Sequence, residues 1–350
     1  MITDAGSYRV IIEKGSLGTA GRYVSSVTGG TRCVTVSDDT VYGLYGRTLE
    51  NSLRDAGIDV AESFVFPHGE GSKNMSVLGK LLDMMCEVKL SRRDMVVALG
   101  GGVTGDLAGF AAAVYMRGIR HVQIPTTLLA MADSSVGGKT AVDSRYGKNL
   151  IGAFHEPSLV ICDPELLGTL PGEYFADGMA EVIKTGFVCD PVLIGMLEKG
   201  ADEGIEDMIG RCVSDKAGIV SGDLCDRGER QKLNFGHTAG HAMELLSDYS
   251  VGHGRAVASG MVLFTRAAVK RGICHEDTLR ALIALLTRYG LDPELYRRFG
   301  PGDIFSAASR DKKGNGDTLT VVLPTGTGKC SLFVLPYAEL EGLIEDGYSL

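Results

Sequence analysis

The chain has 350 residues and a formal charge of −9, and an acidic chain of this kind lacks the basic face of a general nucleic-acid binder. Its 44% apolar and 23% charged residues are typical of a globular protein, and its length favours two domains or one large lobed unit. No stretch reaches the ~18 uninterrupted apolar residues of a membrane span, and the first residues form no signal region. We therefore expect a cytoplasmic protein that binds neither nucleic acid nor a membrane.

The first half of the chain alternates short β-branched runs with segments of helical periodicity. Strands are predicted at residues 32–38, 64–67, 95–99 and 121–125, and helices at residues 45–57, 76–88 and 105–118. Such alternation predicts a mostly parallel sheet flanked by helices.

The pattern changes at about residue 173. From there, apolar residues recur at spacings of three and four, and only TLTVVLP and CSLFVLP predict strands, paired as one hairpin near the end. We therefore predict an α/β domain over residues 1–172 and a mainly α-helical domain over residues 173–350. The eight cysteines are widely spread and never form CxxC, which indicates reduced thiols and no thiolate zinc site.

The segment ALGGGVTGDLAG places Gly100, Gly102 and Gly105 at GxGxxG spacing between a buried strand and a helix. Bare backbone amides at a helix N-terminus can bind a pyrophosphate, so the segment indicates a dinucleotide site. However, no acidic residue ends a following strand ~20 residues later, as the dinucleotide fingerprint requires. A glycine-rich turn without a ligand therefore remains an equal alternative.

The next polar segment, MADSSVGGKTAV, resembles a phosphate-binding Walker A loop but has Asp133 in place of the first glycine. This replacement disfavours nucleotide hydrolysis. Together with RYGKNL, the segment is predicted to form a pair of polar loops that offer Lys139, Lys148 and Asn149 to an anion. The alternative is a solvated pair of surface lysines.

Three of the seven histidines lie within residues 234–257. His237 and His241 share one helical face, as two ligands of one metal would, but HTAGH lacks the glutamate of the metalloprotease motif HExxH. Polar packing without a metal remains the simpler alternative for this pair. His253 follows a glycine turn, as a ligand presented from a loop would. In AEVIKTG, Glu181 is either a carboxylate ligand or half of a surface ion pair with Lys184.

Several long motifs, taken together, closely resemble the 3-dehydroquinate synthase family of the shikimate pathway over roughly residues 30 to 315. They are PHGEGSK, GGGVTGDLAGFAAAVYMRG, QIPTTLLAMADSSVGGKTAV, GKNLIGAFHEP, AEVIKTG, LNFGHTAGHA, GHGRAVASGM and RDKK. The resemblance implies a fold similar to that of glycerol dehydrogenases, with an NAD-binding α/β domain, a helical metal-binding domain and the active site in the cleft between them. It also implies a homodimer.

The resemblance implies the following site residues. The metal, zinc or alternatively cobalt, would be held by Glu181, His237 and His253. NAD would contact Asp38, Glu70, Lys73, Gly101, Gly102, Val103, Gly105, Asp106, Thr126, Thr127, Asp133, Lys139, Lys148, Leu166 and Thr169. The substrate would contact Asp133, Lys139, Asn149, Lys184, Lys216, Arg230, Asn234, His241, His253, Lys312 and Lys313, and Arg117 would reach the neighbouring subunit's site.

The implied reaction converts 3-deoxy-D-arabino-heptulosonate 7-phosphate to 3-dehydroquinate by oxidation at C5, phosphate elimination, re-reduction and aldol closure. Sibling sugar phosphate cyclases of the aminodehydroquinate, inosose or valiolone type are alternatives, as is a metal-dependent polyol dehydrogenase. Lys216, Arg230, Asn234 and His241 together favour the carboxylate-bearing heptulosonate. One departure is Arg255, which stands where the family usually has glutamate and is predicted to change metal affinity modestly.

Overall fold

The computed structural model describes residues 1–29, 32–201, 204–310 and 317–350. It divides into two compact units, and each is described by itself. Unit 1 comprises Met1–Leu170 with Lys216–Gly218, and unit 2 comprises Pro171–Asp215 with Ile219–Leu350. The boundary expected at residue 172 differs from this division by two residues and by the short segment Lys216–Gly218.

Unit 1 is built on a seven-stranded sheet with the order β1-β2-β9-β6-β5-β3-β4. Its strands are β1 (Ile2–Asp4), β2 (Arg9–Ile12), β3 (Arg32–Asp38), β4 (Asp59–Phe66), β5 (Met95–Gly100), β6 (Arg120–Pro125) and β9 (Leu159–Cys162). β1 is antiparallel to β2, and every other neighbouring pair is parallel. The mostly parallel sheet predicted from the sequence is therefore confirmed.

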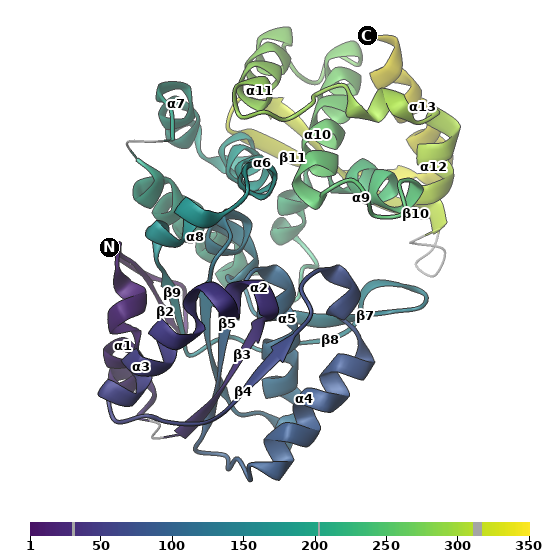
Figure 1. Ribbon diagram of the computed structural model, residues 1–350. Helices are drawn as coiled ribbons and strands as arrows, with labels where there is room; N and C mark the ends of the chain where they lie inside the picture. The colour runs from purple at the N-terminus through teal and green to yellow at the C-terminus, as the bar shows by residue number, and fades with distance from the viewer. Residues whose placement is uncertain (30–31, 202–203, 311–316) are drawn as a thin grey trace. The chain divides into compact units, whose positions relative to one another are not determined.

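Helices cover both faces of this sheet (Figure 1). They are α1 (Ala20–Thr28), α3 (Arg47–Asp55), α4 (Met75–Glu87) and α5 (Gly102–Val114), whereas the short α2 (Asp39–Val41) follows β3 at its carboxyl end. Val34 of β3 belongs to a hydrophobic core with Leu81 of α4 and Leu107 of α5. Thr35 points to the opposite face, and its hydroxyl donates a hydrogen bond to the hydroxyl of Ser63. The Ser63 hydroxyl in turn donates a hydrogen bond to the carboxylate of Glu50 in α3. The alternation of side chains along β3 thus separates α4 and α5 from α3.

The connections reverse direction between the neighbouring strands β3 and β5. From β3 the chain passes through α3 to the edge strand β4, whereas from β5 it passes through α5 to β6 on the other side. Ser37 pairs with Leu99 at the carboxyl ends of these two strands. Asp38 and the glycine loop that starts at Gly100 therefore leave the sheet side by side. In parallel α/β sheets, ligands bind at such a switch point.

The polar loops predicted around residues 133–149 are partly wrong. Lys139–Ser144 forms β7 and Gly147–Phe154 forms β8, and the two strands make an antiparallel hairpin. The physical reason is burial: Val142 belongs to the core beside α4 and α5, and Thr140 packs against Gly109 of α5. The lysines at the ends of this hairpin obscured a buried strand between them.

Unit 2 is largely helical, as predicted. Its elements are α6 (Gly172–Cys189), α7 (Pro191–Lys199), α8 (Ile205–Gly222), α9 (His237–Leu246), α10 (His253–Lys270), α11 (Glu276–Arg288), α12 (Pro301–Arg310), β10 (Thr318–Gly326), β11 (Lys329–Pro336) and α13 (Tyr337–Ser349). β10 and β11 form the hairpin expected near the end of the chain. Within the ranges that the structure describes, no helix is both long enough and apolar enough to cross a membrane.

Candidate active site

Three side chains from three helices of unit 2 converge on one point. Glu181 lies in the middle of α6, and His237 and His253 are the first residues of α9 and α10. The Oε1 atom of Glu181 lies 3.8 Å from Nε2 of His237 and 3.5 Å from Nε2 of His253. Ligand atoms placed ~2 Å from a tetrahedral zinc ion lie roughly 3.3 Å apart. These three atoms are therefore spaced as the ligands of one small metal ion.

Glycines allow α9 and α10 to bring the two histidines together. Gly236 has φ +80°, and a Cβ atom there would lie 2.5 Å from the carbonyl oxygen of Val257. A Cβ atom on Gly260 would lie 2.2 Å from the carbonyl oxygen of Gly236. Any larger residue at either position would push the helices apart. The glycines of the two histidine motifs are thus required by packing.

Glu181 is a buried carboxylate without a hydrogen bond. Its side chain is 1% exposed, and neither of its oxygens has a hydrogen-bond partner among the residues that the structure describes. Lys184 forms an ion pair with Oε2, but this pair is buried rather than on the surface, since Lys184 is only 2% exposed. An unbonded buried carboxylate oxygen between two imidazole nitrogens fits a bound cation. Two histidines and a carboxylate are an established zinc ligand set.

The two histidines have different electrostatic environments. Burial, reinforced by the charge of Lys184, lowers the pKa of His237 well below its ordinary value, so this imidazole is neutral and can bind a metal. Burial also opposes protonation of His253, but the neighbouring carboxylates of Glu181 and Glu244 outweigh it and raise the pKa of His253 to about 10. A metal that binds Nε2 of His253 must therefore replace a proton.

Glu244 is a residue that the sequence reasoning missed. Its side chain is 4% exposed, and Nδ1 of His253 lies 3.1 Å from its Oε2. An Nδ1–H that donates to this carboxylate leaves Nε2 for the metal. The available signal was spacing, because Glu244 follows His237 by seven residues and His241 by three, which places all three on one face of α9.

His241 lies beside the metal-ligand cluster but differs from it in exposure. Its ring centroid is 5.4 Å from that of His237 and 5.8 Å from that of His253. His241, Glu244 and His253 form a second group that could hold a cation. His241 is exposed, whereas Glu181 is buried. The assignment of His241 to the substrate rather than to the metal stays a prediction.

The remaining substrate candidates of unit 2 are placed only in part. Arg230 and Asn234 lie in the short 3₁₀ turn Glu229–Asn234 just before α9. Arg230 is buried, and its Nη1 donates to the carbonyl oxygen of Leu224 at 2.8 Å. Lys312 and Lys313 lie outside the described residues.

The glycine loop of unit 1 leads directly into α5. Gly101 is the N-cap of this helix and offers no side-chain cap, and the first turn carries no acidic residue. A Cβ atom on Gly101 would lie 3.0 Å from Thr127, and one on Gly105 would lie 3.1 Å from Gln123. Uncapped amides at the positive end of a helix attract an anion. The neighbouring hydroxyl of Thr126 is buried and has no hydrogen-bond partner among the residues that the structure describes.

Lys73 contacts several of the residues that were predicted to bind the cofactor. Its ammonium group lies 2.5 Å from Asp106, 2.6 Å from Asn149 and 3.8 Å from Glu70. Burial opposes its charge, but the carboxylates of Asp106 and Glu70 outweigh burial and raise the pKa of Lys73 above its ordinary value. Asn149, predicted to contact the substrate, thus lies with residues predicted to contact NAD.

Asp133 and Lys216 meet although they lie 83 residues apart in the sequence. The Lys216 ammonium donates to the backbone oxygen of Asp133 at 2.7 Å and forms an ion pair with its carboxylate. Lys139 is exposed at the start of β7, and Lys148 is half-buried in β8. Asp38 caps α2 by accepting from the amide of Val41 at 2.9 Å.

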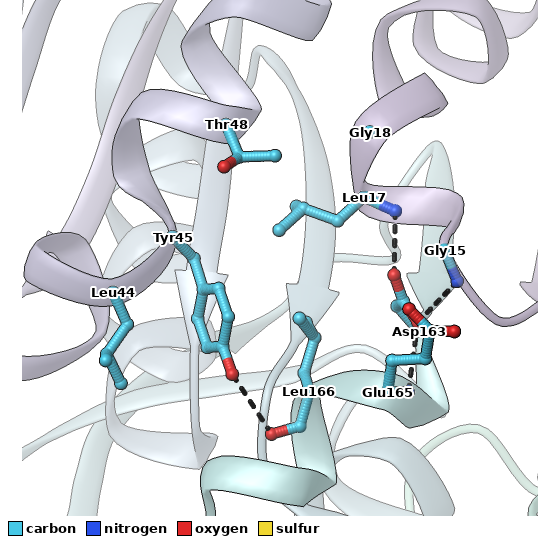
Figure 2. Close-up of a pocket in the computed structure, with 9 residues that line it drawn as sticks. All are labelled: Gly15, Leu17, Gly18, Leu44, Tyr45, Thr48, Asp163, Glu165 and Leu166. Atoms are coloured by element: carbon cyan, nitrogen blue, oxygen red, sulfur yellow. Dashed lines mark hydrogen bonds between the residues drawn. The ribbon is translucent and has the colours of Figure 1, made fainter.

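A pocket of about 370 Å³ lies beside the 3₁₀ turn Pro164–Thr169 (Figure 2). Leu166 and Leu17 line it, and Tyr45 faces Leu166 across it. The Tyr45 hydroxyl lies 2.6 Å from the hydroxyl of Thr169 and donates to the carbonyl oxygen of Leu166. The carboxylate of Asp163 accepts hydrogen bonds from the backbone amides of Gly15 and Leu17, and all three residues line the pocket. Leu166, predicted to contact NAD, thus lines the pocket, and Thr169, also predicted to contact NAD, bonds to the lining residue Tyr45.

Arg117 is exposed on an unusual turn. Met116, Arg117 and Gly118 have φ values of +50°, +67° and +117°, so three successive residues are left-handed. On one side, the Tyr115 hydroxyl donates to Leu90 at 3.0 Å. On the other, Nε2 of His155 lies 2.8 Å from the carbonyl oxygen of Ile119. The turn is thus fixed by its surroundings, and it presents Arg117 outward.

Two family models match consecutive parts of the chain. The model described as 3-dehydroquinate synthase N-terminal matches residues 63–177, and that described as 3-dehydroquinate synthase C-terminal matches residues 178–314. A 3-dehydroquinate synthase of Clostridium kluyveri is 38% identical over 347 residues, which are 97% of this chain and 95% of the relative. One of Nostoc punctiforme is 43% identical, over 92% of this chain and 91% of the relative.

The chain belongs to the 3-dehydroquinate synthase family. It is therefore an enzyme of the shikimate pathway, as the motifs predicted. The solved structure of ValA, a 2-epi-5-epi-valiolone synthase from Streptomyces hygroscopicus with NAD⁺ and Zn²⁺ bound, is 27% identical with a TM-score of 0.88, over 99% of this chain and 98% of that one. A 2-deoxy-scyllo-inosose synthase with carbaglucose-6-phosphate, NAD⁺ and Co²⁺ is 26% identical with a TM-score of 0.83, over 97% of each chain.

A more distant structure, a probable glycerol dehydrogenase from Sinorhizobium meliloti, is 15% identical with a TM-score of 0.67 over 97% of this chain and 96% of that one. This likeness concerns the fold alone, and it confirms the fold similarity expected for the family.

Proposed function

We propose that this family member converts 3-deoxy-D-arabino-heptulosonate 7-phosphate to 3-dehydroquinate and phosphate with bound NAD and a divalent metal, zinc or cobalt. The observation that carries the proposal is the cluster of Glu181, His237 and His253 in unit 2. A carboxylate oxygen without a hydrogen bond faces two imidazole nitrogens there, at distances suited to one cation. The valiolone synthase that is similar to this chain contains NAD⁺ and Zn²⁺.

Bound NAD would supply a reversible hydride acceptor for C5, and a bound metal would lower the pKa of the hydroxyl to be oxidised. Glu181, His237 and His253 would hold the metal, and Lys184 holds the second oxygen of Glu181. Glu244 orients His253 through Nδ1. The ketone formed at C5 acidifies the neighbouring proton, and the phosphate of the substrate accepts that proton as it leaves.

The cofactor contacts in unit 1 follow from the same chemistry. The uncapped amides of the glycine loop before α5 suit the pyrophosphate. Thr126 offers a buried hydroxyl beside them. Lys73, held by Glu70 and Asp106, adds a fixed positive charge. The pocket next to Leu166, whose mixed lining includes leucines and a tyrosine ring beside polar groups, suits the adenine end.

The substrate carries a carboxylate and a phosphate, so an acidic protein needs a local cluster of cations to bind it. We assign this role to Lys139, Lys184, Lys216 and Arg230, together with Lys312 and Lys313. His241, exposed beside the metal ligands, is assigned to the substrate. Lys216 is held in place by Asp133.

We also propose a homodimer in which Arg117 reaches the site of the partner. The turn around Arg117 has successive positive φ angles and leaves Arg117 exposed. Also in unit 1, β8 exposes Leu150, Ile151 and Phe154, which are 59%, 37% and 55% exposed. Exposed apolar residues in such a group are typical of an interface. Light scattering at micromolar concentration tests the proposal, and a monomer would contradict it.

One assay separates the proposed function from its rivals. The heptulosonate phosphate is supplied with catalytic NAD and zinc, and phosphate release is followed together with NADH absorbance. Stoichiometric phosphate without accumulating NADH supports the proposal. Accumulating NADH would indicate a polyol dehydrogenase. Phosphate release only from a hexose phosphate, a heptulose phosphate without a carboxylate or an amino-substituted analogue would indicate the corresponding sibling cyclase.

A further inference from the structure

Asp177 lies one turn before the metal ligand Glu181 on α6, yet its side chain points to the beginning of α10. Oδ1 accepts from the backbone amide of Arg255 at 2.8 Å and from Nε of the same residue at 3.3 Å. The Asp177 side chain is 8% exposed, and Arg255 also approaches Glu173 at 3.7 Å. One carboxylate of α6 thus binds both the main chain and the side chain of the first turn of α10.

This contact replaces a missing cap. α10 begins after Gly252, which has no side chain and makes no capping hydrogen bond. The amide of Arg255 is one of the free donors of the first turn, and a carboxylate at this end also favours the helix dipole. Asp177 therefore caps α10 from a different helix.

The two helices approach closely at this point. A Cβ atom on Gly254 would lie 2.1 Å from the backbone oxygen of Asp177, and one on Gly252 would lie 2.3 Å from its carboxylate. His253 stands between these two glycines as the first residue of α10. The position of its ring relative to Glu181 is consequently fixed by the contact between Asp177 and the first turn of α10.

We propose that Asp177 is a positioning residue of the metal site, which sets the distance between Glu181 and His253 by joining α6 to the first turn of α10. Asp177 is not among the residues assigned to the metal or to the substrate. The proposal rests on the metal site assigned under the proposed function. Residues that orient metal ligands typically change metal affinity by about 10- to 100-fold when they are replaced.

The test is a titration of metal-free protein with Co²⁺, followed by the visible absorption of the bound ion. Asp177→Ala is expected to raise the Kd for Co²⁺ at least about tenfold. Asp177→Asn is expected to raise it less, because an amide oxygen can still accept from the amide of Arg255. The absorption spectrum should change as well, since the geometry around the ion changes.

Asp190 provides a matched control at the other end of α6. It caps α7 through the amides of Val192 and Leu193 and binds Arg211 at 2.6 Å. Like Asp177, it therefore caps a helix and pairs with an arginine, but α7 carries no histidine. Asp190→Ala should alter thermal stability and leave the Kd for Co²⁺ within about twofold.

The outcomes separate the two proposals. If the unaltered protein binds Co²⁺ and both Asp177 variants bind it equally well while losing thermal stability, Asp177 is only structural and the inference is overturned. If Asp177→Ala does not fold, the Kd of Asp177→Asn decides. If the unaltered protein itself binds no Co²⁺, the metal site of the proposed function fails, and the inference fails with it.

Discussion

Removal of the Glu244 carboxylate should weaken metal binding without removing a metal ligand. Glu244 is 4% exposed and accepts from Nδ1 of His253 at 3.1 Å. In Glu244→Ala the imidazole loses both its orienting partner and the nearby negative charge. In Glu244→Gln the amide oxygen can still accept from Nδ1–H, and only the charge is lost.

The expected magnitude follows from this geometry. A hydrogen bond to a charged group contributes about 1.5–3 kcal/mol, and loss of an orienting partner typically costs 10- to 100-fold in metal affinity, or about 1.4–2.7 kcal/mol. The two estimates agree. We therefore expect Glu244→Ala to raise the Kd for zinc about 10- to 100-fold, and Glu244→Gln to raise it about 3- to 10-fold.

Competition with a chromophoric chelator measures this Kd directly. Glu50→Gln is the control, because Glu50 is another buried carboxylate, hydrogen-bonded to Tyr42 and Ser63 in unit 1. This variant should lose stability and keep the zinc affinity. Equal zinc affinities of Glu244→Ala and the unaltered protein would refute the reasoning, because His253 would then hold its orientation without Glu244.

Three further predictions follow from the site and its surroundings. His237→Ala should lose zinc, whereas His241→Ala should retain zinc within about threefold in Kd and lose turnover, since the exposed ring of His241 is assigned to the substrate. Lys73→Gln should weaken NAD binding at least about tenfold in calorimetry, because a fixed charge is lost. Asp215→Asn should raise the free energy of unfolding by about 1–3 kcal/mol at pH 8 and by about half as much at pH 5 in urea titrations, because burial and the nearby Asp190 raise the pKa of Asp215 to about 6.

The sign of the Asp215 effect follows from proton linkage. A carboxyl whose pKa is raised in the folded protein binds protons more tightly there, so this contribution to stability is fully present below the unfolded pKa of about 4 and is lost as the pH rises from there through about 6. The asparagine side chain in Asp215→Asn does not ionise, so this variant does not lose stability as the pH rises. An equal effect at both pH values would contradict the explanation. The histidine prediction would be contradicted if His241→Ala lost zinc as readily as His237→Ala. The Lys73 prediction would be contradicted if the control Lys80→Gln, at an exposed lysine, also weakened NAD binding about tenfold.

Much of unit 1 could be predicted because its signals are local. The strand from Met95 to Gly100 is buried at every position, and the helix that follows it starts within the glycine loop. A buried parallel strand produces a continuous apolar run, and a helix produces its own period. The hairpin of β7 and β8 was not predicted, because lysines and glycines flank the short buried segment of β7. Neither the alternation of a strand nor the periodicity of a helix was therefore visible in the sequence.

The metal site depends on contacts that no local period records. Spacing alone favoured a pair of His237 and His241, since periodicity reports only neighbours on the same helix. Glu181 and His253 come from other helices. Glycine contacts bring α10 close to α9 at Gly236 and Gly260, and close to α6 at Gly254. The family resemblance provided these ligands, whereas residue spacing could not have done so.

Glu181 and Lys184 show that the spacing of two charged residues on a helix does not reveal their role unless the burial of their side chains is known. Three residues apart on a helix, a glutamate and a lysine ordinarily form a surface ion pair of little energetic value. Here both side chains are at most 2% exposed, and burial of a carboxylate is costly unless each of its oxygens has a partner. Lys184 pairs with one oxygen, and among the residues that the structure describes the other faces the two imidazoles. A cation between them would complete the set, so a spacing that indicates a surface pair in the sequence here marks a candidate metal ligand in the fold.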